Sequence, residues 1–378
     1  MSPPSTSAQP LETFAATAPS SRLWLRLRLV ALVIGALSMA FGLYTGLLRL
    51  GVALPGGAQA IADFHGAFMI SGFLGTVICL ERAVALGRTW PYAGPLLSGL
   101  GAVALIAGAP WFGALAFAAA AGVLLTASVS IVFRQPALFT LVLAVGAACW
   151  MVGTLQWMLG GFTPAVTGWW LSFLILTVAA ERLELSRMRE ASPLSQIAFS
   201  GAILLLLLGS AREELAGSWA PLTAAALIAC ATWLIRHDVA RRTVRVRGLA
   251  RFSAVAILIG HGWLGAAGVL LFLMLAGVTE FSYDAVVHAV TIGFVLSMIF
   301  GHAPIILPAV TGVRVRFSRA AYAPLILLHV SLLIRIAGDV FKQGDLRVAS
   351  GYVTIVALAA YAVTLLLTST KRSLHVKI

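Results

Sequence analysis

The sequence predicts an all-α fold: a polytopic membrane protein with about twelve transmembrane helices. Three observations predict it: 60% of the 378 residues are hydrophobic, only 10% are charged, and the mean hydropathy is +0.99. Soluble domains carry about 25% charged residues, whereas each crossing of a bilayer needs roughly 20 consecutive apolar residues. This composition excludes a soluble enzyme, a nucleic-acid-binding protein and a disordered chain.

The expected helices are apolar runs bounded by proline, glycine or clusters of charge. In order, they are residues 24–48, 62–84, 92–109, 111–133, 137–159, 165–187, 195–211, 219–236, 253–278, 283–310, 320–338 and 350–369. The least marked boundary lies at Gly108–Pro110, since the chain is almost continuously apolar from 92 to 133. We expect one twelve-helix transmembrane domain over residues 23–378. A disordered cytoplasmic tail rich in Pro, Ser, Thr and Ala, residues 1–22, should precede it.

The placement of lysine and arginine supports this helix count, because cytoplasmic loops are enriched in positive charge. With the N-terminus inside, all 26 basic residues lie on the cytoplasmic side except Arg49, Arg212, Arg335, Lys342 and Arg347. We therefore expect a bacterial inner-membrane protein with both termini in the cytoplasm. The net charge of +13 is then an orientation signal and an attraction to anionic lipid. It requires no nucleic acid, and the lipid bilayer is the expected partner.

A faint internal repeat runs along the chain. The second expected helix ends T-V-I-C-L-E-R (76–82) and the sixth ends T-V-A-A-E-R (177–182), which suits three pseudo-repeated blocks of four helices. The tenth expected helix, residues 283–310, takes the third corresponding position. The Glu81–Arg82 and Glu181–Arg182 pairs at these helix ends could relay protons or bind lipid or quinone headgroups. Ion pairs that anchor the helix ends are the simpler interpretation.

Histidines are the most informative ionisable residues, because such side chains are costly in hydrocarbon and are candidates for function. Five of the seven fall inside expected helices. His65 and His288 lie in the first turns of two helices that run in the same direction, so both should lie near the outer surface. An acid precedes each, Asp63 and Asp284, and could orient the imidazole. Two histidines from different helices at one depth suit axial ligation of a haem iron, or part of a copper site.

A second metal site is predicted deeper in the bundle. His302 follows His288 by fourteen residues, which is about 21 Å along a helix and about 40° off the same face. His261 or His329 would be its partner. Gly72, nearly on the face of His65, would give a flat macrocycle room at the backbone. Packing explains these residues too, since small residues let membrane helices approach closely and a buried histidine can simply hydrogen-bond to a neighbour.

The stretch V-V-H-A-V-T-I-G-F-V-L-S-M-I-F-G-H-A-P (286–304) resembles the NnrS family of twelve-helix bacterial inner-membrane proteins. The stretch F-H-G-A-F-M-I-S-G-F-L-G (64–75) is similar to that family's early histidine-bearing helix. The resemblance implies haem and copper as cofactors and a role in the response to nitric oxide. The family's usual Gly-His-Thr-Gly-Arg is replaced here by Gly-His-Ala-Pro at 301–304, which leaves the number and identity of the metals open.

A more distant likeness is to subunit I of the haem–copper oxidases, which has twelve helices in three arcs. Histidines of the second and tenth helices ligate the low-spin haem there, and His65 and His288 match them by position. The oxidases also need histidines on the sixth and seventh helices for copper. The corresponding segments here, 165–187 and 195–211, contain none, so oxygen reduction at such a centre is not expected.

Two functions of different classes follow. The first is a haem b protein, with or without copper, in a redox or nitric-oxide-response role that takes electrons from a donor or quinone. The second is a proton-coupled secondary transporter without haem, and a ligand-free structural protein is a third, weaker alternative. An ATP-driven pump or a hydrolase is not expected, because no Walker, GxSxG or HExxH motif is credibly placed. Whether the protein is catalytic is not decided by the sequence.

Overall fold

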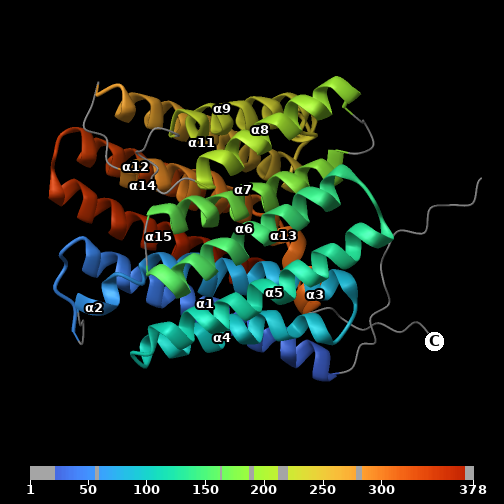
Figure 1. Cartoon of the computed structure of the whole chain (residues 1–378), viewed down its shortest axis with the longest axis horizontal. Helices are drawn as coiled ribbons and strands as arrows, with labels where there is room; N and C mark the ends of the chain where they lie inside the picture. Colours follow the sequence, from blue (N-terminus) through green and yellow to red (C-terminus); the bar gives the residue numbers. More distant parts are fainter. Residues whose placement is uncertain are drawn as a thin grey trace, which may run out of the picture.

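The computed structural model is a bundle of long helices (Figure 1), described for residues 22–55, 59–161, 164–186, 191–211, 220–277 and 283–370. The predicted tail lies outside the described residues, apart from Arg22. So do some of the basic residues used for the orientation, namely Arg187, Arg189, Arg212, Lys371, Arg372 and Lys377.

The helices of the first half follow the expected order. They are α1 (Arg22–Arg49), α2 (Gln59–Ala62), η1 (Ala67–Gly75), α3 (Thr76–Leu86), η2 (Trp90–Tyr92), α4 (Ala93–Ile106), α5 (Pro110–Arg134), α6 (Leu138–Gly160) and α7 (Pro164–Ser186).

The second half continues in the same way. Its elements are α8 (Pro193–Ala211), α9 (Ala220–His237), α10 (Ala240–Thr243), α11 (Leu249–Leu275), α12 (Tyr283–His288), η4 (Ala289–Leu296), α13 (Ser297–Thr311), β1 (Arg314–Val315), η5 (Arg319–Ala321), α14 (Tyr322–Val340), α15 (Gly344–Thr368) and β2 (Ser369–Thr370).

Eleven helices among the described residues are long and apolar enough to cross a membrane, and Trp90–Ile106 is a shorter apolar helix. The predicted class, an all-α polytopic membrane protein, is confirmed. The unmarked boundary between α4 and α5 is made by Gly108, whose φ of 75° suits glycine, and by Pro110 in the first turn of α5. Helices are expected here, because a backbone in lipid must satisfy its hydrogen bonds within its own segment.

One end of the bundle is marked by a small antiparallel pairing of β1 with β2, in which Arg314 lies opposite Thr370. This pairing joins the connection after α13 to the end of α15. α11 and the helix that ends in α13 are consecutive crossings that run antiparallel, so the connection between α9 and α11 lies at the same end. This connection carries Arg241, Arg242, Arg245 and Arg247. We call this the basic end.

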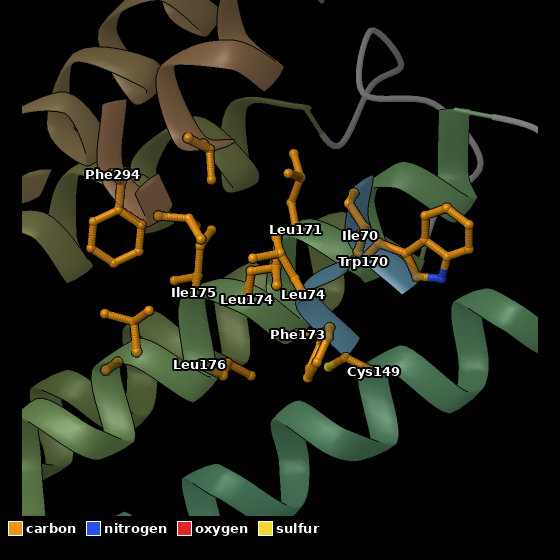
Figure 2. Close-up of a cluster of buried hydrophobic side chains, with 14 of the residues drawn as sticks. Ile70, Leu74, Cys149, Trp170, Leu171, Phe173, Leu174, Ile175, Leu176 and Phe294 are labelled. Carbon is orange, nitrogen blue, oxygen red and sulfur yellow. The ribbon is translucent and has the colours of Figure 1, made fainter. Parts of the chain in front are cut away.

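The central helix of the bundle is α7. In its most apolar window 83% of the residues are buried inside the protein, against 22% in both α1 and α15. Figure 2 shows Phe173 and Leu174 of α7 beside Leu74 of η1 and Cys149 of α6. Phe173 also stacks on Trp150 of α6 at a centroid distance of 5.1 Å. Ionisable side chains on α7 must therefore find their partners within the protein.

Two transmembrane helices contain long π-helical stretches, η1 and η4. Each stretch begins just after one of the predicted ligands, His65 or His288. π-Helical turns are rare and occur mostly at functional sites. The two helices were expected to correspond in the three-block repeat. That repeat stays a prediction, and their shared irregularity favours it.

We predict that Gly268→Ala lowers the stability of the protein. A Cβ added there would lie 2.6 Å from the carbonyl oxygen of Ala224 and 2.7 Å from Cγ1 of Ile228, so α9 and α11 would have to separate. Overpacking of this kind costs about 1–3 kcal/mol, and the midpoint of thermal unfolding in detergent should fall. Gly262→Ala is the matched control, because Gly262 lies on the same helix with no neighbouring atom within 4 Å of its added Cβ. Equal midpoints for the two variants would contradict the close packing.

Candidate functional site

The structure brings His65 and His288 together at the end of the bundle opposite the basic end. His65 lies two residues before η1 and His288 ends α12, so both lie where their helices begin. The centroids of the two imidazole rings are 6.3 Å apart and the ring planes differ by 19°. We call these two residues the histidine pair. The sequence predicted that they share a depth, and in the structure they also face each other.

Hydrogen bonds fix the tautomer of both rings. His65 donates from Nδ1 to the carbonyl oxygen of Gly42 on α1, at 2.6 Å. His288 donates from Nδ1 to the carbonyl oxygen of Asp284, at 2.8 Å. A carbonyl oxygen only accepts, so the proton of each neutral ring lies on Nδ1. Both Nε2 lone pairs are therefore available, which is the form in which imidazole binds a metal.

A charged group supports His288 from behind. The carboxylate of Asp284 accepts two hydrogen bonds from Arg335, at 2.6 and 2.9 Å, and lies 3.3 Å from Nδ1 of His288. A carboxylate behind an imidazole fixes its orientation and raises its basicity as a ligand. The expected role of Asp284 agrees with this contact. Asp63 is exposed, and Gly42 orients His65 in its place.

Gly46 of α1 gives His65 its space, and the sequence analysis missed it. A Cβ on Gly46 would lie 2.9 Å from Cε1 of His65. Gly42 and Gly46 are four residues apart, so they occupy one face of α1, which was the available signal. The predicted Gly72 packs on α1 as well, because its added Cβ would lie 3.1 Å from Cβ of Ser38. Its role beside a cofactor stays a prediction.

A second polar group lies nearer the basic end and centres on Arg182 of α7. Its Nε and Nη2 donate to the two carboxylate oxygens of Asp238, at 2.8 and 2.7 Å, and its Nη1 donates to Nε2 of His302, at 2.9 Å. His261 Nε2 lies 2.9 Å from Asp238 Oδ2. We call Arg182, Asp238, His261 and His302 the Arg182 network. It joins α7, the residue after α9, α11 and α13.

Asp238 is the anion of this network. Burial alone would raise the pKa of Asp238, but the hydrogen bonds from His261 and Arg182 and the charge of the guanidinium hold it well below its usual range. The carboxylate also accepts from the backbone N–H of Ala240, at 2.8 Å, at the start of α10. The bidentate pairing of arginine with carboxylate is a strong and geometrically specific contact.

This arrangement does not favour the predicted second metal site. His302 donates from Nδ1 to the carbonyl oxygen of Met298, at 2.7 Å, so its Nε2 lone pair is the one that faces the cationic Arg182. His329 lies apart and accepts a hydrogen bond from Trp263 Nε1, at 3.1 Å. Within the described ranges, no three His, Cys, Asp or Glu side chains gather to hold a metal ion. Ligation by His302, His261 and His329 stays a prediction without support from these contacts.

His302 does not share a site with His288, because fourteen residues of helix separate the two by about 21 Å. A uniform α-helix would put them about 40° apart. η4 lies between His288 and His302, and its wider turns change the angle between the two side chains around the helix axis. His288 contacts His65, whereas His302 contacts Arg182 of α7.

The chain belongs to the DUF8744 family, described as a domain of unknown function, whose family model matches residues 28–370. This match covers both the histidine pair and the Arg182 network. No curated protein matches the chain.

We predict that Arg182→Met is strongly destabilising. The substitution removes the guanidinium that pairs with the buried Asp238 carboxylate and donates to His302, and breaking a buried ion pair costs about 3–5 kcal/mol. The double variant Arg182→Met/Asp238→Asn should regain part of this loss, because the uncompensated charge is gone. Thermal unfolding in detergent measures both effects.

The matched control for this prediction is Arg241→Met. Arg241 is exposed and donates to the carbonyl oxygen of Arg236, at 3.2 Å. A surface substitution of this kind changes stability by less than about 0.5 kcal/mol. If Arg182→Met behaves like this control, the Arg182 network does not hold the bundle together.

Proposed function

We propose that this chain is a membrane haem protein, in which His65 and His288 would hold the iron of one b-type haem. The observation that carries the proposal is the histidine pair, with each Nδ1 proton bonded to a carbonyl oxygen and each Nε2 lone pair available. The ring centroids are 6.3 Å apart, so both side chains would be within reach of one iron.

The surrounding residues fit the demands of such a site. Gly42 and Asp284 hold the two rings in the ligating tautomer, and Arg335 neutralises the carboxylate that backs His288. Haem with two histidine ligands supplies one-electron transfer, and its environment sets the potential. A redox role, with electrons from a membrane donor or quinone, is therefore the proposed activity. The resemblance of 286–304 to the NnrS family adds nitric oxide response to this proposal, with copper as a further cofactor.

A proton-coupled secondary transporter without haem is the rival function. The Arg182 network favours it, because buried ionisable groups that join several transmembrane helices are typical of transport pathways. The colour of the purified protein separates the two functions. Haem gives a Soret absorption band, whereas the transporter alone gives none.

The test of the haem site is replacement of each histidine. His65→Ala and His288→Ala should each convert a six-coordinate low-spin absorption spectrum into a high-spin one, or remove the haem. The double variant should be little worse than either single variant, because residues that act as one unit are not additive. If both are only packing residues, each change costs about 1–2 kcal/mol of interhelical hydrogen bonding and has no spectral effect.

His237→Ala is the matched control, since His237 lies at the end of α9 and pairs with Ser195. Its spectrum should equal that of the wild type. Haem content is compared at equal yields of folded protein, because an empty site could itself destabilise the bundle. Wild-type protein that purifies from iron-replete cells without haem or copper would refute the proposal and leave the transporter.

We further propose a bacterial inner-membrane location with both termini in the cytoplasm. The basic end would then face the cytoplasm, as the enrichment of positive charge in cytoplasmic loops requires. Fluorescent-protein fusions within residues 238–250 should be bright. Alkaline phosphatase fusions within 342–347 should be active, because that connection would lie in the periplasm. The opposite result at 238–250 would invert the orientation.

A further inference from the structure

A small internal cavity lies between α7, α8, α9 and the helix formed by α12 and η4. Its volume is about 10 Å³, which is about the space that one water molecule needs. Most of its lining is apolar, and its polar side chains are Ser172 of α7, Ser210 of α8 and Thr223 of α9. We call these three residues the hydroxyl cluster. Neither the histidine pair nor the Arg182 network includes it.

The hydroxyl of Thr223 is the unusual member of this cluster. Thr223 is only 5% exposed, and its Oγ1 has no hydrogen-bond partner within the part of the chain that the structure describes. It lies against α8 at Gly209, where an added Cβ would clash with it. A buried hydroxyl without a partner is costly, so Thr223 needs an acceptor for its proton inside the protein.

The two serines of the cluster leave an acceptor free. Their Oγ atoms are 2.9 Å apart. Ser210 Oγ donates to the carbonyl oxygen of Leu206, at 2.9 Å, and also lies 3.4 Å from that of Gly168. A carbonyl oxygen only accepts, so the single proton of Ser210 is engaged there and Ser172 donates to Ser210. Ser172 Oγ therefore keeps its lone pairs for a further donor.

A water molecule fits these groups by size and by hydrogen bonding. Thr223 offers a donor and Ser172 an acceptor, and water can both accept and donate. Buried waters make two to four hydrogen bonds, typically to polar groups that lack other partners. The cavity is too small for an organic ligand. Its lining, all of it in the described ranges, includes no ionisable side chain that could hold a metal cation.

We propose that Ser172, Ser210 and Thr223 form a binding site for one internal water molecule. The water accepts the proton of Thr223 and donates to Ser172, which in turn donates to Ser210. It thereby links α9 to α7 and α8 where direct contact between the hydroxyl groups of Thr223 and the serines is missing among the described hydrogen bonds. The inference does not depend on a bound haem.

X-ray radiolysis of the full-length protein in detergent, read out by mass spectrometry, tests the site. Radiation converts water into hydroxyl radicals, which hydroxylate the side chains next to it. Leu206 lines the cavity and is only 2% exposed. It should be hydroxylated in spite of its burial. Leu174 is the matched control, because it is 1% exposed and packs beside Leu74 instead (Figure 2). It should stay unmodified.

Thr223→Val removes the hydroxyl and keeps the shape of the side chain. If water is bound, hydroxylation of Leu206 should decrease and the midpoint of thermal unfolding should fall, because the water loses its donor. If the hydroxyl has no partner, the same change removes a buried unsatisfied group, and the midpoint should stay the same or rise. Thr126→Val is the control variant, since Thr126 is exposed and already donates to the carbonyl oxygen of Gly122, at 2.8 Å.

The outcomes separate clearly. Hydroxylation of Leu206 no stronger than that of Leu174 in the wild type would overturn the proposal. So would unchanged hydroxylation of Leu206, or a midpoint that does not fall, in Thr223→Val. Size-exclusion chromatography checks that each variant is folded. If Thr223→Val does not fold, Ser172→Ala replaces it, because this change removes the acceptor of the water, and hydroxylation of Leu206 at the wild-type level would then contradict the site.

Discussion

The rest of the structure depends on the pairing of Arg182 with Asp238. Arg182 lies on the most buried helix of the bundle, so its charge has no access to lipid headgroups or bulk water. A charge in that position is tolerated only when its hydrogen-bonding groups are engaged. Asp238, His261 and His302 provide those partners from three other segments. The network therefore fixes α7, α11 and α13 relative to one another.

The positions of the two imidazole rings of the histidine pair depend on this central packing. η1 and η4 both pack near α7, with Leu74 and Phe294 in the buried cluster around it (Figure 2). The close contact of α1 at Gly46 and the bond from His65 to Gly42 then place one ring. Asp284 and Arg335 place the other. The apolar surfaces of the helices have little preference for one packing arrangement over another. The polar contacts at both ends of the bundle thus select the arrangement that is observed.

Most of the fold could be predicted from the sequence, because apolar runs and basic loops report directly on bilayer crossings. The depth of His65 and His288 followed from the same count. The partners of Arg182 could not be predicted, since Asp238 lies in a connection where a charged residue is unremarkable. The hydrogen bond from His65 to the carbonyl oxygen of Gly42 could not be predicted either. Every residue has a carbonyl group, and only the packing of the helices decides which one lies beside the imidazole. π-Helical stretches have no composition that separates them from ordinary apolar helix, so the change that η4 makes to the angle between His288 and His302 could not be predicted.

The π-helical stretch η1 has a mechanical consequence for the helix that carries it. A π-turn holds one residue more than an α-turn, and one residue corresponds to about 100° of rotation. The stretch therefore sets the angular offset between His65 at one end of this helix and Glu81 at the other. Any movement that converted a π-turn into an α-turn would twist one end against the other without unfolding the helix. The π-helical stretch would thus allow the part of this transmembrane helix that carries His65 to rotate relative to the part that carries Glu81.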